Sequence, residues 1–567
     1  MKRARDARRA DPAGHAATEL ACRAPAARAP LSERVAFFAL VAVLSARGLM
    51  PETFEPVELS FLDADTLAGG PTLFSIAVLD LLLLVAATLV LAPARTLATA
   101  APAAVLAAAL LIVSVVVSTA AAADQRIAAN AGAHLVAMTL AGFALAKLTR
   151  HRDLARLALA AVLATGCANA VKCFAQRSTE FGQTLEEWNV RKQQLLDAGY
   201  AVDDPLLVNF ERRIRSAEAF GFHYHPNIAA SSMMMALLAA AGAAAALLVR
   251  PGREAAHTGA SSAARETAPG RADPRAAPHP PTARDARPSR ALPIVVLLGA
   301  GATLLAALPL TGSAGALLAL LAGAAVFGAL LVLRDRVPRL RRRLIVTLVG
   351  VYVVVISAGA VWGLARGTLP HSSLAFRWQY WTASIAAYAD APLTGLGREN
   401  FADAYLRHKS ADAVEEVRNP HNLWLSLLVE LGPVGLLAGA LLALIAASAA
   451  LPTSANAATR PGEAATAGSE IELAEATEQT RTRCAPARAT IVALIVALAA
   501  VHALFGGVAL QNPAVAIVWS IELVGVWAFA LVGCAWAIGF VEGRTRANVL
   551  CFGAFAALAA SLVHGLV

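Results

Sequence analysis

Long uninterrupted runs of apolar residues constrain the fold of this chain more than any other feature. About 13 such runs are present, most of them close to the roughly 20 residues that a helix needs to cross a bilayer. They lie near residues 35–50, 73–92, 101–123, 131–148, 154–175, 227–249, 292–310, 313–333, 344–365, 421–450, 489–509, 513–540 and 547–567. Charged residues make up only 15% of the chain, against roughly 25% in soluble globular proteins. The sequence therefore predicts an all-α polytopic integral membrane protein with about 12 or 13 transmembrane helices.

Basic residues follow a pattern that gives this bundle an orientation. Lys and Arg are retained in cytoplasmic loops. With a cytoplasmic N-terminus, each of the inner loops contains Lys or Arg, and these loops are 147–153, 250–291, 334–343, 451–488 and 542–546. The outer side then holds the acidic segment 52–65 and two long polar segments, 176–226 and 366–420. Topology thus accounts for the net charge of +9, and we expect membrane lipids and no nucleic acid as partners.

The same pattern divides the chain into regions. We expect a basic, uncleaved cytoplasmic tail, because the first apolar run begins too late for a cleavable signal. Two Ala-, Pro- and Arg-rich stretches have almost no large apolar residues and are expected to be flexible cytoplasmic linkers. The predicted regions are the tail 1–34, an N-terminal bundle 35–249, a linker 250–291, a core 292–450, a linker 451–488 and C-terminal helices 489–567. The six cysteines form no CxxC pair, which argues against a zinc site or a disulfide framework.

The outer segments are where we expect chemistry, since purely structural connections are usually short. One contains "FRWQYWTASIAAYADAPLTGLGRENF" (376–401). In a helix, Arg377 and Trp381 share a face, and Trp378 and Trp381 suit the membrane–water boundary. An Arg there can bind a phosphate through two N–H groups. The alternative is that the tryptophans only anchor the helix at the membrane–water interface, with Arg377 snorkelling into the water. Pro392 and the glycines after it predict a tight turn.

The stretch "RNPHNLWLSLLVELGPVG" (418–435) opens an apolar run with polar residues. Pro420 allows a helix to begin directly after it, which would place His421 and Asn422 on the outermost turn. A neutral imidazole at this place can act as a base, although a helix cap with a His of no special role would look the same. Glu430 would lie about 13 Å along the helix, where an acid is a functional or paired-structural candidate. Gly432 and Pro433 predict a kink just after it.

The earlier outer segment ends with a similar order of residues. In "NFERRIRSAEAFGFHYHPN" (209–227), Arg213 and Arg215 come first, with Arg212 beside them, and "HPN" then opens an apolar run at Asn227. The two outer segments therefore look like two halves of one site. A short turn of small residues, "LTGSAG" (310–315), lies between two other runs.

Together these residues resemble the O-antigen ligase and O-antigen polymerase superfamily of membrane glycosyltransferases. Arg377-Trp378 with Pro392, Gly395 and Gly397 is similar to the family's Arg–Trp helix and the turn that follows it. His421-Asn422 with Leu425, Glu430, Gly432 and Gly435 is similar to its signature after the large periplasmic loop. Two weaker similarities are Gly221 with His225-Pro226-Asn227, and Thr311-Gly312-Ser313. One departure is Ala314, which stands where many members carry Arg.

The resemblance implies a GT-C-like membrane enzyme of the bacterial inner membrane with its active site facing the periplasm. It implies transfer of a glycan from an undecaprenyl-diphosphate-linked donor to a lipid, glycan or protein acceptor, without a metal or another cofactor. Arg377 is then expected to bind the diphosphate, His421 to act as base or to orient the acceptor, and Asn422 to position His421. The further expected substrate contacts are Arg213, Arg215, Trp378, Trp381, Asn227, Arg418 and Glu430, and Glu430 is also expected to hold its helix in place.

Three other functions fit parts of the pattern. A polymerase of the same superfamily would extend the lipid-linked glycan, whereas a ligase, which we favour, would move it to a new carrier. A multi-pass transporter or lipid flippase would also use a broken helix and an intramembrane acid. The polar residues gather on one side of the membrane, however, and no pair of interrupted runs is repeated in the two halves. A scaffold subunit would leave Arg377 and His421 without a role.

Overall fold

The computed structural model describes most of the chain. The described residues are 29–50, 73–92, 101–223, 225–249, 291–413, 415–453, 484–505, 513–541 and 544–565. The expected acidic segment 52–65 lies outside them, as do nearly all of the expected tail and of both expected linkers.

The described residues form helices and no strand, and eleven of the helices are long and apolar enough to cross a membrane. These eleven are α4 (Leu73–Leu91), α6 (Pro102–Ala121), α7 (Gln125–Leu148), α8 (Arg152–Ala175), α11 (Pro226–Leu248), α13 (Ala291–Ala307), α14 (Ala314–Val332), α15 (Val337–Arg366), α18 (Leu423–Ala450), α22 (Pro513–Gly539) and α23 (Arg544–His564). Two further long helices, α2 (Leu31–Arg47) and α21 (Cys484–Phe505), coincide with expected apolar runs. The prediction of an all-α polytopic membrane protein is confirmed.

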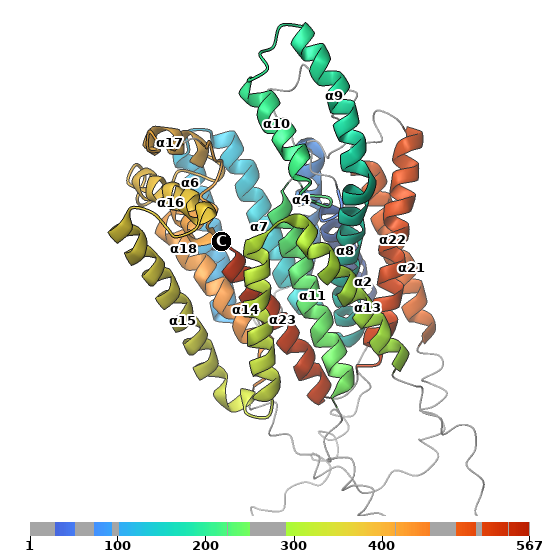
Figure 1. The fold of residues 1–567 in the computed structure, drawn as a ribbon. Helices are drawn as coiled ribbons and strands as arrows, with labels where there is room; N and C mark the ends of the chain where they lie inside the picture. Colours follow the sequence, from blue (N-terminus) through green and yellow to red (C-terminus); the bar gives the residue numbers. More distant parts are fainter. Residues whose placement is uncertain are drawn as a thin grey trace, which may run out of the picture.

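Small residues set how closely the membrane helices pack. Lipid tails are as apolar as Leu, so helices associate in a bilayer where small side chains let their backbones approach. The crossing of α11 and α23 shows this, because a Cβ on Gly242 would lie 2.9 Å from the Cα of Gly553. By contrast, α15 lies at the edge of the bundle (Figure 1) and exposes a row of large apolar side chains that includes Val353, Val354 and Val355.

The polar segment 176–226 is largely helical. α8 continues through a π-helical turn, Gln176–Glu180, into α9 (Phe181–Asp197), and α10 (Pro205–Ser216) packs back against α9. This hairpin has a small core of its own, formed by Trp188, Leu195, Leu207 and Ile214. It projects beyond the rest of the bundle (Figure 1).

The second polar segment, 366–420, contains two shorter helices. They are α16 (Ser372–Tyr388) and α17 (Phe401–His408), which pack against each other and lie over the end of α18. We call the end of the bundle that carries α9, α10, α16 and α17 the outer end. Both segments in which the sequence placed the chemistry are found there (Figure 1).

Candidate active site

α18 is broken near its outer end, at the glycine that the sequence marked as a kink. Gly432 has φ 69° and ψ −172°, which is not helical. Pro433 follows and has no N–H, so it cannot donate to the carbonyl of Val429 four residues earlier. That carbonyl instead accepts from the N–H of Leu396, at 2.9 Å, and the Glu430 carbonyl accepts from Gly397, at 3.0 Å. The tight turn expected after Pro392 therefore docks into the break.

Glycine is required where this turn meets the broken helix. Gly395 has φ +73°, and a Cβ there would lie 2.5 Å from the carbonyl oxygen of Glu430. A side chain is also excluded at Gly432 of the broken helix, since an added Cβ would lie 2.5 Å from the carbonyl oxygen of Leu393 in the turn. The two sequence motifs with the clearest family resemblance thus form one structural unit.

The Glu430 side chain lies inside this unit and is 1% exposed. Its carboxylate forms an ion pair with the guanidinium of Arg398, and it accepts a hydrogen bond of 3.2 Å from the N–H of Glu399. These contacts tie the turn to α18. Both carboxylate oxygens are taken by protein groups, so the geometry favours a bracing role for Glu430 over the substrate contact that was also expected.

The start of α18 differs from the expectation. The helix begins at Leu423, and Asn422 is its N-cap, with its side-chain Oδ1 accepting from the N–H groups of Trp424 and Leu425, both at 3.1 Å. Placing His421 and Asn422 on the first helical turn was therefore wrong. His421 has φ +50°, and its N–H donates to Oδ1 of Asn419 at 3.0 Å, so an Asn-centred turn comes before the helix.

Arg377 reaches this turn from α16. Its Nη1 donates to the backbone carbonyl of His421 at 3.2 Å. The neighbouring Trp378 packs on Gly363 of α15, where a Cβ would come within 2.6 Å of the indole, and it meets Trp381 edge to face at 6.5 Å between ring centroids. The two tryptophans thus fix the position of α16. Burial lowers the pKa of Arg377, and an arginine remains charged at neutral pH.

The imidazole of His421 lies among other rings. Its centroid is 5.7 Å from that of Tyr380, whose hydroxyl donates to the carboxylate of Glu415. It is 6.5 Å from the ring of His225, the N-cap of α11, whose Nδ1 accepts from the N–H of Asn227 at 3.1 Å. Burial, the charge of Arg377 and the neighbouring His225 lower the pKa of His421 to about 4. His421 is therefore a neutral imidazole at physiological pH.

The two weaker motifs meet beside each other at the same end. The N–H of Ala219 donates to the carbonyl of Leu310 at 2.8 Å, which joins the segment before His225 to the 310–315 turn. Oε1 of Gln176 accepts from the N–H groups of Phe220, at 3.0 Å, and Gly221, at 2.9 Å. The buried side-chain amide of Gln176 therefore fixes the backbone of the segment that leads to α11.

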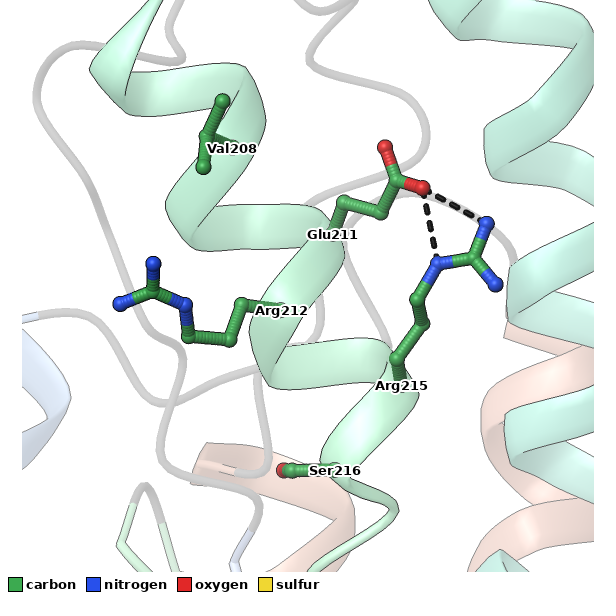
Figure 2. A pocket seen from close by; sticks show the side chains of 5 residues that line it. All are labelled: Val208, Glu211, Arg212, Arg215 and Ser216. Atoms are coloured by element: carbon green, nitrogen blue, oxygen red, sulfur yellow. Dashed lines mark hydrogen bonds and ion pairs between the residues drawn. The ribbon is translucent and has the colours of Figure 1, made fainter.

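The arginines of α10 lie in a different environment. Arg215 is 58% exposed and pairs with Glu211, 2.7 Å from Nη2 to Oε1. Figure 2 shows that Arg212 points away from this pair. Lys192 and Arg215 lower the pKa of Glu211 to about 2, which keeps it ionised. An open hollow of about 480 Å³ lies here, but Glu211 lines it and offsets Arg215, so it is a poor anion site. The Arg213 side chain lies outside the described residues.

The comparison with protein families adds an independent observation. Residues 299–440 match the family model described as O-antigen ligase. This segment is therefore similar to the O-antigen ligase family, and we call it the O-antigen ligase domain. The O-antigen ligase domain runs from α13 into α18 and contains Arg377, His421 and the Glu430 unit. No curated protein and no solved structure matched the chain.

Some residues beside this domain were not selected from the sequence. His225 was noted only as part of a motif, and His564, at the end of α23, was not noted at all. The structure places His564 directly before Gly565, whose carbonyl accepts from the N–H of Leu423 at 2.9 Å, so His564 lies close to the His421 turn. In the sequence, His564 is recognisable only as a polar residue near the end of an apolar run. This pattern does not show which groups the residue faces in the folded protein. Arg418, which was selected, is exposed three residues before His421.

Proposed function

We propose that this protein transfers a glycan from an undecaprenyl-diphosphate-linked donor to an acceptor at the periplasmic face of the bacterial inner membrane. The observation that carries the proposal is the contact of Arg377 with the His421 turn inside the O-antigen ligase domain. A fixed cation and a neutral imidazole, side by side at the outer end of a membrane bundle, suit a reaction whose leaving group is a lipid diphosphate.

In this reaction the acceptor hydroxyl oxygen forms a bond to the anomeric carbon of the donor sugar. The bond from that carbon to the diphosphate oxygen breaks, and undecaprenyl diphosphate leaves with the electron pair. Arg377 keeps one N–H on the His421 carbonyl and presents its other N–H groups to the diphosphate. A cation held at the place where negative charge develops lowers the barrier.

His421 receives the proton of the acceptor hydroxyl. Without donor, its low pKa of about 4 keeps an imidazole nitrogen free to accept. A bound diphosphate would offset the charge of Arg377, and an opposite charge nearby favours the protonated form of an imidazole. Donor binding thus raises the basicity of His421 when it is needed. Asn422 supports this role indirectly, by capping α18 directly after His421.

The other expected residues surround this pair. Trp378 and Trp381 lie on α16 near Arg377. Asn227 lies in the first turn of α11, after the N-cap His225. In this proposal Arg418 contacts the acceptor, because it is exposed near His421. Arg213 and Arg215 would act as a second clamp only if the α9–α10 hairpin moved toward α16, since Arg215 is paired with Glu211.

We favour a glycan transferase over a transporter. Broken helices also occur in transporters, but here the break in α18 is filled by the turn after Pro392, and Glu430 is paired with Arg398. Such a unit suits a rigid enzyme scaffold. A ligase and a polymerase would use the same residues, so only their products separate them.

The test is a transfer assay with the purified protein in lipid nanodiscs, an undecaprenyl-diphosphate-linked oligosaccharide and lipid, glycan and protein acceptors. We expect His421→Ala and Arg377→Lys each to lose at least about 100-fold in rate. His408→Ala is the matched control. His408 lies on the same outer segment, but its ring is hydrogen-bonded to Asp390, away from the proposed site. A glycan of unchanged length on a new carrier means ligase, and a ladder of lipid-linked lengths means polymerase. Wild-type rates in both variants would contradict the proposed site.

A further inference from the structure

The helices α11 and α23 deliver two histidines to the same end of the bundle. They pack along each other, with Gly242 and Gly553 at the point of closest approach. His225 caps the N-terminus of α11, and His564 is the last residue of α23. Because the two helices are antiparallel, the first residue of one and the last residue of the other lie at the outer end.

The end of α23 is attached to the start of α18. The N–H of Leu423 donates to the carbonyl of Gly565 at 2.9 Å. The hydroxyl of Tyr352 donates to the carbonyl of Leu562 at 3.3 Å and accepts from the indole N–H of Trp424 at 2.5 Å. His564 is therefore held next to the His421 turn. These bonds also satisfy carbonyls that would otherwise direct negative charge at this place.

The printed contacts gather these groups around the His421 turn. The ring of His225 lies 6.5 Å from that of His421, and Arg377 donates to the His421 carbonyl at 3.2 Å. His564 directly precedes Gly565, which is bonded to Leu423 just after this turn. Four elements thus contribute one group each: α11, α16, the turn before α18, and α23. A guanidinium with imidazoles around it offers one fixed positive charge and several N–H donors, which is a donor set for an anion with several oxygens.

We propose that His564 and His225 complete, with Arg377, the site that binds the diphosphate of the donor, and that His564 donates a hydrogen bond to a phosphate oxygen. The inference rests on the proposed function and deepens it. A diphosphate has more acceptor oxygens than one arginine can satisfy while it also holds the His421 carbonyl. The N-terminus of α11, directly after His225, adds a favourable dipole. The O-antigen ligase domain then needs α11 and α23, which lie outside the matched residues, to bind its donor.

The first test measures the affinity of farnesyl diphosphate for the full-length protein in phosphatidylcholine nanodiscs. We expect His564→Ala to weaken binding about tenfold or more, because a hydrogen bond to a charged group is lost. His564→Gln, which keeps an N–H donor, should recover part of the affinity. The matched control is His151→Gln. His151 is also at a helix end, as the N-cap of α8, but it is paired with Glu33. Equal affinity in wild type and both His564 variants would overturn the inference.

A second measurement on the wild-type protein avoids any folding defect of the variants. Diethyl pyrocarbonate acylates neutral imidazoles, and peptide mapping reports each histidine separately. Farnesyl diphosphate should protect His564 and His225 and leave His151 unchanged. Inorganic pyrophosphate should protect them at higher concentration, whereas replacing phosphatidylcholine by phosphatidylglycerol should not. Protection by phosphatidylglycerol alone, or no protection of His564, would contradict a diphosphate site.

The outcome for Arg377→Ala separates this inference from the proposed function. If Arg377→Ala loses farnesyl diphosphate binding while the His564 variants keep it, the donor site remains and His564 is removed from it. If Arg377→Ala also binds like wild type, the proposed donor site itself is wrong.

Discussion

A single residue, His421, shows how position determines chemistry at this site. Its backbone has φ +50°, and its carbonyl is bound by Arg377. Its ring is half-buried beside Tyr380 and His225. An ordinary imidazole has a pKa of about 6.5, but burial and the charge of Arg377 lower the pKa of His421 to about 4. The group is therefore ready to accept a proton over the whole physiological range.

The pH dependence of transfer tests this state. The base must be unprotonated, so kcat/KM, which reports the free enzyme, should stay constant down to the pKa of about 4 and fall as the pH drops below it. The acid limb of kcat should lie at higher pH, because bound diphosphate raises the pKa of His421. Rates measured at saturating and limiting donor give the two profiles, with His408→Ala as control. An acid limb of kcat/KM centred at about 6.5 would mean an unperturbed imidazole.

At the scale of the element, the break in α18 depends on a second segment. The sequence correctly marked Gly432-Pro433 as a kink and 392–397 as a tight turn, because both signals are local. Their docking was not visible in the sequence. It depends on the free carbonyls of Val429 and Glu430 accepting from Leu396 and Gly397. The start of the same helix was predicted two residues too early, since the turn at Asn419 delays it.

Gly395→Ala tests the docking. The substitution puts a Cβ at φ +73° and 2.5 Å from the Glu430 carbonyl oxygen, so the folded state should lose about 1–3 kcal/mol. We expect a lower thermal unfolding midpoint in detergent and reduced transfer. Gly350→Ala is the matched control, because no heavy atom lies within 4 Å of its added Cβ, in the middle of α15. Equal midpoints for the two variants would mean that the turn does not dock as described.

At the scale of the molecule, the proposed site combines segments that lie far apart in the sequence. Arg377 and His421 belong to the O-antigen ligase domain, whereas His225 and His564 come from helices on either side of it. His225 precedes α11, Arg377 lies on α16, His421 precedes α18 and His564 ends α23. The outer end, where α9, α10, α16 and α17 lie (Figure 1), is where these elements meet. The proposed reaction therefore needs this end to face the periplasm.

Cysteine labelling tests the orientation. In a cysteine-free background, Glu416→Cys should react with a membrane-impermeant maleimide added outside, and Asp335→Cys should react only after the membrane is opened. The positions are matched, because both are acidic and exposed, at 74% and 87%, at opposite ends of the bundle. The reverse labelling pattern would place residues 366–420 in the cytoplasm and would contradict the proposed transfer at the periplasmic face.

The sequence by itself determined the class of fold, the places of most helices and the kink at Gly432, and it singled out Arg377 and His421 as candidates. Each of these depends on a local pattern, such as a bilayer-length apolar run or a short motif. The tertiary structure decided which polar groups lie close together, and it placed His225 and His564 near the His421 turn. The reason is that helices apolar on all sides carry little information about their rotation. Close crossings such as Gly242 with Gly553 set that rotation.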